Sequence, residues 1–179
     1  MLLIPALAIA SANEWSGHVS GIVGLKTMDS SDWPELDSHF SMGLILDIKK
    51  DSWPVNMVLG IADTGDKHKH EGMEDLGHTT EYQLGIGKIF SHQGSKIQPY
   101  LGGGVSFIYA EQEFEENNVS TRRDDDVVGI WIGAGMYYEI NPKLVLGVDL
   151  RFSDGEISLF EQDINAGGLH VGATAGYQF

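Results

Sequence analysis

Three histidines lie in one polar stretch of the chain, residues 63–78, together with several carboxylates. His68 and His70 are separated by one residue, and His78 closes the stretch. Imidazole and carboxylate groups are ligands of transition metals, and a His-x-His pair can present two nitrogens to one ion. The residue types therefore predict a metal site at His68, His70 and His78, with an ordinary solvated polar segment as the alternative.

The elements that must position these side chains are predicted by strict alternation of apolar residues. In residues 169–179, every second residue from Leu169 to Phe179 is apolar. Period two places alternate side chains on opposite faces of a strand, and about 9–11 residues of tilted strand cross a bilayer. Seven further runs begin near residues 15, 40, 55, 82, 101, 128 and 144. We therefore predict an all-β fold, an eight-stranded antiparallel up-and-down transmembrane β-barrel.

The connections between these runs alternate in length and in charge. Long polar segments cover residues 27–38, 63–78, 111–126 and 154–168, and short turns cover 49–54, 91–97 and 141–143. The long segments carry a net charge of −16 and the short turns +3, within a chain of net charge −15. Bacterial outer-membrane barrels keep their short turns in the periplasm, so we expect both termini on that side. The acidity argues against nucleic acid as a partner, because phosphate binding needs a basic face.

The amino terminus has the features of a secretory signal. Residues 1–12 form an apolar segment that ends in Ala-Ser-Ala, a small-x-small cleavage motif, so we expect a signal peptide cut after Ala12. The segment lacks a positively charged start, and we therefore expect the true start codon upstream. Residues 13–179 then form one barrel domain. The absence of cysteine fits an oxidising compartment in which a closed barrel, not disulfides, provides stability.

Small residues on the second face of the strands decide between a membrane barrel and a soluble barrel of the lipocalin kind. That face is dominated by glycine and serine, as in the runs around Gly102 and Gly133. Strand surfaces that face water usually carry lysine, glutamate and threonine, and glycine weakens a strand that has nothing to pack against. Small residues are suited to the interior of a narrow barrel, which favours the membrane interpretation.

A few charged residues share the inward parity of these glycines. Arg151 is the inward arginine, and Asp47, Glu81, Glu139 and Asp149 are its candidate carboxylate partners. Charges in so confined a lumen should be paired. Two interpretations stay open, namely a hydrogen-bonded plug that fills the lumen and a gated pore in which Arg151 exchanges carboxylates.

Aromatic residues cluster toward both ends of the predicted strands, as expected for interfacial girdles. Trp131 and Tyr137 instead have inward parity, so either the surrounding glycines make space for them or a bulge resets the strand. The girdle near the short turns is Trp15, Trp53, Phe90, Tyr100, Tyr138, Tyr177 and Phe179, and the girdle near the long segments is Phe40, Phe107, Tyr109 and Phe152.

Three segments resemble a known family. They are Ile-Gln-Pro-Tyr-Leu-Gly-Gly-Gly-Val at 97–105, the long alternating run at 129–152, and the ending Gly-Tyr-Gln-Phe at 176–179. These segments resemble the OmpA/OmpX-like small outer-membrane β-barrel family. The resemblance implies an integral protein of the bacterial outer membrane in contact with lipids and lipopolysaccharide. Narrow barrels are usually complete as monomers, so we expect a monomer, and no cofactor is expected. It also implies that Tyr177 and Phe179 form the signal read by the barrel-assembly machinery.

For function, we expect a structural or surface-interaction role through the acidic segments, with a narrow pore as the alternative. The carboxylates of residues 111–126 suit divalent cations, while Arg122 and Arg123 suit lipopolysaccharide phosphates. A third alternative is a lipid A-modifying enzyme. Barrels of similar size include lipid A deacylases that use a His-x-Ser arrangement, and His39 and Ser41 match its spacing. Both residues have inward parity, away from the acyl chains of a lipid, so no enzyme activity is expected.

Overall fold

A computed structural model describes residues 14–28, 38–70, 73–116, 119–159, 162–165 and 167–179. The predicted signal peptide, residues 1–12, lies outside these segments. The described residues contain no helix that is long and apolar enough to cross a membrane.

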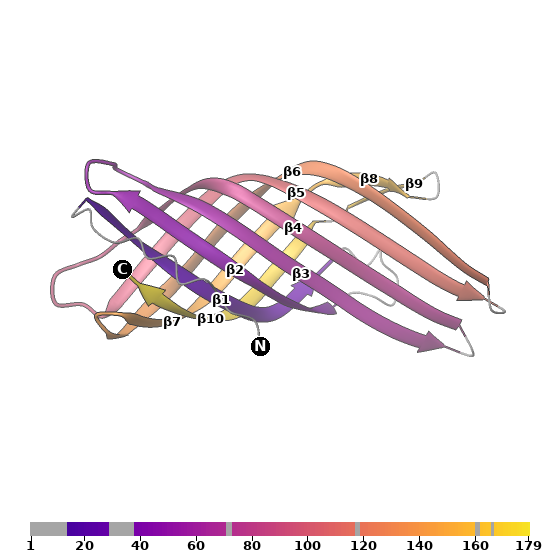
Figure 1. The fold of residues 1–179 in the computed structure, drawn as a ribbon, viewed down its shortest axis with the longest axis horizontal. Coiled ribbons are helices and arrows are strands. Elements are labelled where there is room, and N and C mark those ends of the chain that lie inside the picture. The colour runs from indigo at the N-terminus through magenta and orange to yellow at the C-terminus, as the bar shows by residue number, and fades with distance from the viewer. Residues whose placement is uncertain (1–13, 29–37, 71–72, 117–118, 160–161, 166) are drawn as a thin grey trace.

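Eight of the strands close into one antiparallel barrel in the order β1-β10-β7-β6-β5-β4-β3-β2 (Figure 1). The two short strands β8 and β9 form a separate hairpin. This architecture confirms the predicted eight-stranded up-and-down barrel. The strand bounds are β1 Trp15–Thr27, β2 Ser38–Lys50, β3 Asn56–His70, β4 Met73–Ile89, β5 Ile97–Glu116, β6 Val119–Asn141, β7 Leu144–Asp154, β8 Glu156–Leu159, β9 Gln162–Asn165 and β10 Gly168–Gln178.

The strands are staggered strongly around the barrel. A path of paired residues that leaves Thr27 on β1 and crosses every neighbour returns to β1 at Gly17, ten residues earlier. Such a shear requires strands that are steeply tilted, and a barrel of eight strands has a narrow interior that side chains can fill. The path runs through Leu169, Phe152, Ile132, Gly103, Ile86, Met57 and Ile48.

The two faces of the sheet have the compositions that alternation predicts. Along β7, for example, Leu146, Val148 and Leu150 are exposed on the outside, while Asp149 and Arg151 are buried in the lumen. The same alternation holds on the other barrel strands, whose outward residues within the belt are mostly large and apolar. The barrel therefore presents a continuous apolar belt outside and a polar interior.

Two of the long segments are strands, contrary to the prediction of loops. β3 and β4 stay paired through residues 63–78 as far as His70 and Met73, and β5 and β6 stay paired through 111–126 as far as Glu116 and Val119. The polarity of these segments reflects their departure from the apolar belt, and it does not interrupt backbone pairing. The tall hairpins project beyond the barrel at one end, beside β8 and β9 (Figure 1).

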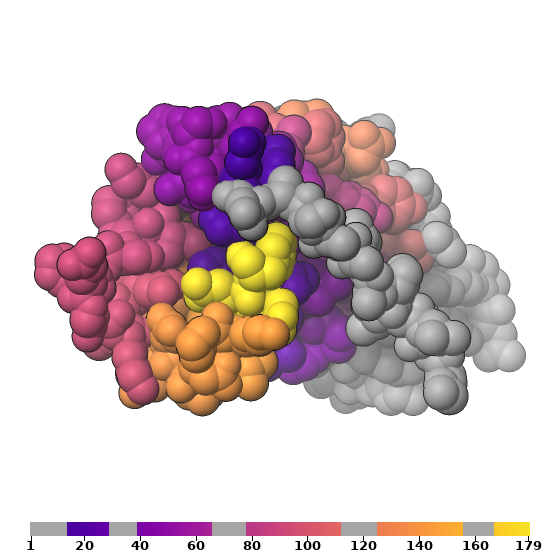
Figure 2. Space-filling view, turned by 60° about the vertical axis from the view of Figure 1, so that its left-hand side comes forward, coloured from indigo at the N-terminus to yellow at the C-terminus, as the bar shows by residue number. Residues whose placement is uncertain are grey.

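The short turns and the carboxy terminus lie together at the opposite end of the barrel (Figure 1). We call this the short-turn end and the other the long-loop end. Figure 2 brings the short-turn end forward and shows β10 in yellow between β7 and β1. The last residue belongs to the barrel ladder, because Phe179 and Gly17 exchange backbone hydrogen bonds of 3.0 and 2.9 Å. Closure is therefore complete to the end of the chain.

Candidate functional site in the lumen

Arg151 is the centre of a buried polar network in the lumen. It lies on β7, and its guanidinium donates hydrogen bonds to Asp149 at 3.1 Å and to the amide oxygen of Gln83 on β4. The guanidinium carbon is 4.8 Å from the ring centroid of Trp131, a cation–π contact. The arginine therefore connects opposite walls of the barrel.

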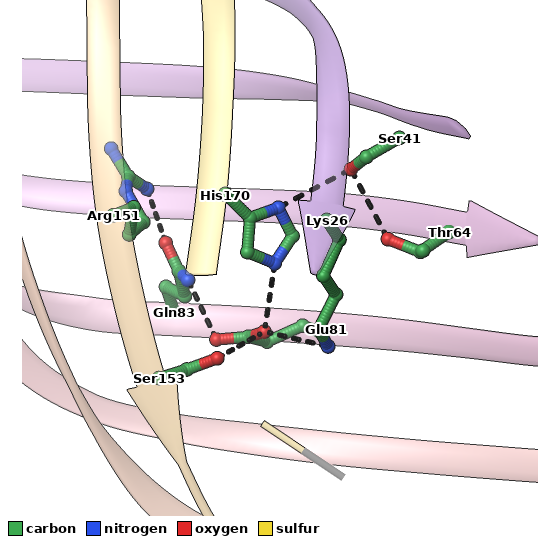
Figure 3. Close-up of polar contacts among 8 residues, drawn as sticks. All are labelled: Lys26, Ser41, Thr64, Glu81, Gln83, Arg151, Ser153 and His170. Atoms are coloured by element: carbon green, nitrogen blue, oxygen red, sulfur yellow. Dashed lines mark hydrogen bonds and ion pairs between the residues drawn. The ribbon is translucent and has the colours of Figure 1, made fainter. Parts of the chain in front are cut away.

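Gln83 continues the network to a second carboxylate, Glu81 (Figure 3). Its amide nitrogen donates to Glu81 at 2.7 Å, and the hydroxyl of Ser153 donates to the same carboxylate at 3.0 Å. Two basic groups also approach Glu81, the Lys26 ammonium at 3.8 Å and His170 Nε2 at 3.7 Å. All of these residues are buried, so the carboxylate charge is balanced by fixed neighbours and not by bulk water.

The imidazole of His170 extends the polar network to β2 and β3. Its Nδ1 atom is 3.4 Å from the hydroxyl of Ser41, which accepts a hydrogen bond of 3.1 Å from Thr64 (Figure 3). His39 and Ser41, the pair with deacylase spacing, are both buried in the lumen. Neither residue therefore faces the lipid-exposed surface, as their parity predicted.

An aromatic layer lies on the short-turn side of Arg151. The Tyr100 hydroxyl donates to Asp149, and the Tyr100 ring stacks on Tyr137 with centroids 4.6 Å apart. Tyr137 stacks in turn on His18 at 5.1 Å. The prediction that Tyr100 belongs to the outer girdle is wrong, because residue 100 has the inward parity of its strand, and parity decides the face whatever the side-chain type.

Glycines make room for the largest lumen residue, Trp131. A Cβ atom at Gly85 would lie 2.8 Å from the indole, and Cβ atoms at Gly102 and Gly133 would lie 3.3 and 3.4 Å from it. β6 also keeps a continuous register with both neighbours through Trp131 and Tyr137. Of the two explanations left open for these aromatics, the glycines provide the space and no bulge resets the strand.

The predicted charge network is assembled in part. Arg151 contacts Asp149 directly and reaches Glu81 through Gln83. Asp47 lines the same small cavity as Arg151 and is subject to its positive charge. The cavity has a volume of about 10 Å³, which is about the space that one water molecule needs. Three of the four predicted carboxylates therefore lie around the arginine.

The fourth predicted carboxylate, Glu139, belongs to a different part of the lumen. It accepts a hydrogen bond of 3.5 Å from Gln98 close to the short-turn end. There Gln98, His18 and Lys49 line a vestibule of about 130 Å³. Inward parity placed Glu139 in the lumen, but its height along the barrel separates it from Arg151.

Two important residues of the network, Lys26 and Gln83, were missed as partners by sequence reasoning. Lys26 shares the inward parity of Ser20 and Gly24, which was the available signal, but it stands next to a long polar segment that suggested exposure. Gln83 shares the inward parity of Glu81 on β4, but nothing in the sequence marks it as the bridge between Arg151 and Glu81. The bridge depends on which residues of β4 and β7 meet across the lumen.

A smaller polar cluster, which we call the outer-face cluster, lies on the outside of β3 and β4. His78 Nε2 is 3.0 Å from both carboxylate oxygens of Asp63, and the Thr80 hydroxyl donates to Asp63 at 3.4 Å. Of the predicted metal ligands, His78 is therefore bound to a carboxylate, while the side chains of His68 and His70 lie outside the described residues. No group of three or more potential ligands is placed to hold a metal ion among the side chains that are described.

The predicted assembly residues Tyr177 and Phe179 lie on the outward face at the end of β10. Their side chains are exposed to the surroundings of the barrel. This position beside the β1 seam leaves both aromatic rings accessible to another molecule at the short-turn end.

Comparisons with known proteins agree with this architecture. A family model described as the outer membrane protein beta-barrel domain matches residues 1–179. Comparison with curated protein sequences returns no match.

Solved structures of similar fold include three small barrels. Neisserial surface protein A is 14% identical with a TM-score of 0.62, covering 95% of this chain and 100% of its own. Ail, the attachment invasion locus protein of Yersinia pestis, is 18% identical with a TM-score of 0.58, covering 94% and 100%. OprG from Pseudomonas aeruginosa is 16% identical with a TM-score of 0.54, covering 92% and 94%. At such identities the likeness concerns the fold.

Proposed function

The chain belongs to the outer membrane β-barrel family, and on that premise we propose a small barrel with an occluded lumen that acts through its acidic long-loop end. It is an integral protein of the bacterial outer membrane. The role is structural or surface-interacting, and its partners are recognised outside the barrel. A monomer is the proposed state, because the barrel is closed without a second chain.

The observation that supports an occluded lumen is the hydrogen-bonded network around Arg151. Opening a path through it requires separation of Arg151 from Asp149 and Gln83, which are all buried. Removing the partner of a buried charge costs several kcal/mol. The stacked rings of Tyr100 and Tyr137 narrow the same region from the short-turn side. The closed arrangement is therefore the stable one.

The acidic long-loop end supports a surface role. The four long segments carry a net charge of −16 in the sequence, and the described parts of 63–78 and 111–126 lie at this end. Such a field attracts cationic partners and repels polyanions. A structure of Ail is described in complex with the heparin analogue sucrose octasulfate, and the opposite preference is proposed for this chain. Its partners would be basic protein surfaces or divalent cations.

The charge asymmetry and the lengths of the connections also support an orientation of the barrel in the outer membrane. We propose that the short turns and both termini face the periplasm, as is usual for such barrels. The signal peptide at residues 1–12 and recognition of Tyr177 and Phe179 by the barrel-assembly machinery belong to the same proposal. A metal site at His68, His70 and His78 is also part of the proposal, and equilibrium dialysis with zinc is its test.

Planar-bilayer conductance of the refolded barrel tests the occluded lumen. The wild type is expected to be silent, because the buried hydrogen bonds of Arg151 to Asp149 and Gln83 close the lumen. The lumen variant is Arg151→Ala. Lys143→Ala, in an exposed turn, removes the same charge without touching the lumen and serves as the matched control. Steady openings of the wild type would overturn the proposal.

A second candidate function, a narrow gated pore, is favoured by the carboxylates around Arg151. Asp149 is bonded to it and Asp47 lies across a small cavity, so the arginine has two partners between which it can move. Steady wild-type openings that change in Arg151→Ala but not in Lys143→Ala would establish this function in place of the first.

Binding to charged surfaces tests the role of the long-loop end. The barrel in lipid nanodiscs is expected to bind immobilised poly-lysine and not heparin, as measured by surface plasmon resonance. Neutralising Glu113, Glu115 and Glu116 to glutamine should weaken the binding, whereas Asp51→Asn at the short-turn end should not. Equal binding of poly-lysine by all variants would contradict a contact surface at the long-loop end.

A further inference from the structure

The lipid-facing surface contains a groove across the seam of the barrel. Gly21 on β1 and Ala173 and Ala175 on β10 lie close together on the lipid-facing surface, where most residues of the belt are large. The groove they leave has a volume of about 680 Å³ and is bordered by larger residues such as Met42 and Leu146. It is therefore a depression within an otherwise continuous apolar surface.

The groove runs diagonally across five strands. One row of paired residues along it is Leu146, Ala175, Gly21, Leu44 and Ile61. Four strand spacings of about 4.8 Å give a length of about 19 Å. Because of the shear, the row rises from the short-turn end toward the long-loop end. Leu146 is two residues from the short-turn end of β7, whereas Ile61 is five residues from the short-turn end of β3. The shape is that of a channel for an extended hydrocarbon chain.

The end of the groove that lies toward the long-loop end of the barrel is polar. Asp63, two residues beyond Ile61, is the charged residue that lines it, and it binds His78 and Thr80 of the outer-face cluster. Thr80 is paired with Tyr109 of the predicted aromatic girdle, so the cluster lies at the edge of the apolar belt. Charged groups on the lipid face are tolerated at that depth because lipid headgroups and water surround them.

We propose that this groove binds one acyl chain of lipopolysaccharide, with the sugar hydroxyl and amide groups of lipid A held at the outer-face cluster. The Asp63 carboxylate accepts hydrogen bonds from sugar hydroxyl or amide groups. When Asp63 bonds to the sugar instead, the Thr80 hydroxyl and the His78 Nε2–H are released from it and can donate to oxygen atoms of the lipid. The choice of an outer-leaflet lipid rests on the proposed orientation, which places the long-loop end outside the cell.

Gly21→Leu tests the groove directly. A Cβ atom at Gly21 meets only the Ala175 carbonyl oxygen, at 3.9 Å, so a larger side chain enters the groove without a clash in the barrel. Ala134→Leu adds a similar side chain to the lipid-facing surface of β6, outside the groove, and is the matched control. Ala175→Leu is the second groove variant, and heat-dependent gel mobility confirms that each protein is folded.

Native mass spectrometry of the refolded barrels with Kdo2-lipid A measures the binding. The wild type is expected to hold one lipid A molecule, and either groove variant to bind it about tenfold more weakly, as when about two methylene groups lose their contacts. Ala134→Leu should bind like the wild type. Unchanged affinity in both groove variants, or an equal loss in Ala134→Leu, would overturn the proposal.

The headgroup end is tested by a second lipid and a second pair of variants. Asp63→Asn and His78→Ala should weaken lipid A binding and leave the weaker binding of phosphatidylglycerol unchanged. Phosphatidylglycerol bound as tightly as lipid A by the wild type would refute the choice of lipopolysaccharide. Ser95→Cys, in a chain without other cysteines, reports the orientation separately. Labelling of this cysteine from outside intact cells would refute the orientation and not the groove.

Discussion

Two ion pairs on opposite faces of the same barrel have nearly the same geometry. Inside, Arg151 and Asp149 are 3.1 Å apart, with side chains 8% and 0% exposed. Outside, His78 and Asp63 are 3.0 Å apart, with side chains 45% and 52% exposed. Distance alone would rank the two pairs as equals, but guanidinium is always charged whereas imidazole is charged only when protonated, and the surroundings of the two pairs differ.

The surroundings of each pair decide how much it contributes to the stability of the barrel. A charge that loses its partner in the lumen has no bulk water to return to, so the loss is expensive. A charge that loses its partner on an exposed surface is resolvated, and the pair is worth little to stability. The inner pair therefore belongs to the structure that closes the lumen. The outer pair is free to exchange its partner for a ligand.

Removal of the inner arginine should have the largest effect. Arg151→Ala leaves Asp149 and the nearby Asp47 without their compensating charge, so we expect the free energy of unfolding to fall by about 3–5 kcal/mol. Urea unfolding in lipid vesicles, followed by tryptophan fluorescence, measures the change. Adding Asp149→Asn should recover part of the loss, because the uncompensated charge is removed with it.

A loss below about 1 kcal/mol would contradict this expectation, because it would place the inner pair among exposed ones. Failure of the double variant to recover any stability would point to packing of the arginine against Trp131 as the larger contribution. Either result would remove the contrast between the two faces.

Two glycines offer a matched comparison of the faces without any change of charge. At Gly135, in the lumen, an added Cβ atom would collide with the Val148 carbonyl oxygen and the Tyr100 hydroxyl. At Gly21, outside, it meets only the Ala175 carbonyl oxygen at 3.9 Å. We expect Gly135→Ala to cost about 1–3 kcal/mol and Gly21→Ala to change stability by less than about 0.5 kcal/mol. The same urea unfolding measures both, and equal losses would show that both faces are packed alike.

Changes to the outer pair should have the smallest effect on stability. Asp63→Asn and His78→Ala each remove an exposed ion pair, so we expect the free energy of unfolding to change by no more than about 1 kcal/mol. Urea unfolding at low and high salt checks the expectation, since the small remaining effect should be screened. A loss above about 2 kcal/mol would indicate a structural role that the exposed position does not suggest.

Alternation of residue types was enough to predict which residues face the lumen. Trp131, Tyr137 and Arg151 were assigned to the inside by parity, and all three are buried there. Where parity was set aside in favour of residue type, the prediction was wrong, as for Tyr100. The polar neighbours of Lys26 similarly concealed its inward position.

Polarity misled the prediction of strand ends. The segments at 63–78 and 111–126 were expected to be loops because they are acidic, yet backbone pairing continues through both. Side-chain charge reports contact with water, while hydrogen bonding between neighbouring strands needs only an extended backbone and a partner. Pairing of this kind is compatible with either environment.

The local pattern determined the number of membrane-crossing strands, their two faces and the set of lumen charges, because a period of two is a property of each strand alone. Which charges meet was decided only in three dimensions. Arg151 on β7 reaches Gln83 on β4, three strands away, while Glu139 pairs with Gln98 near the short-turn end. The ten-residue shear determines these heights, and shear arises from closure of the whole barrel.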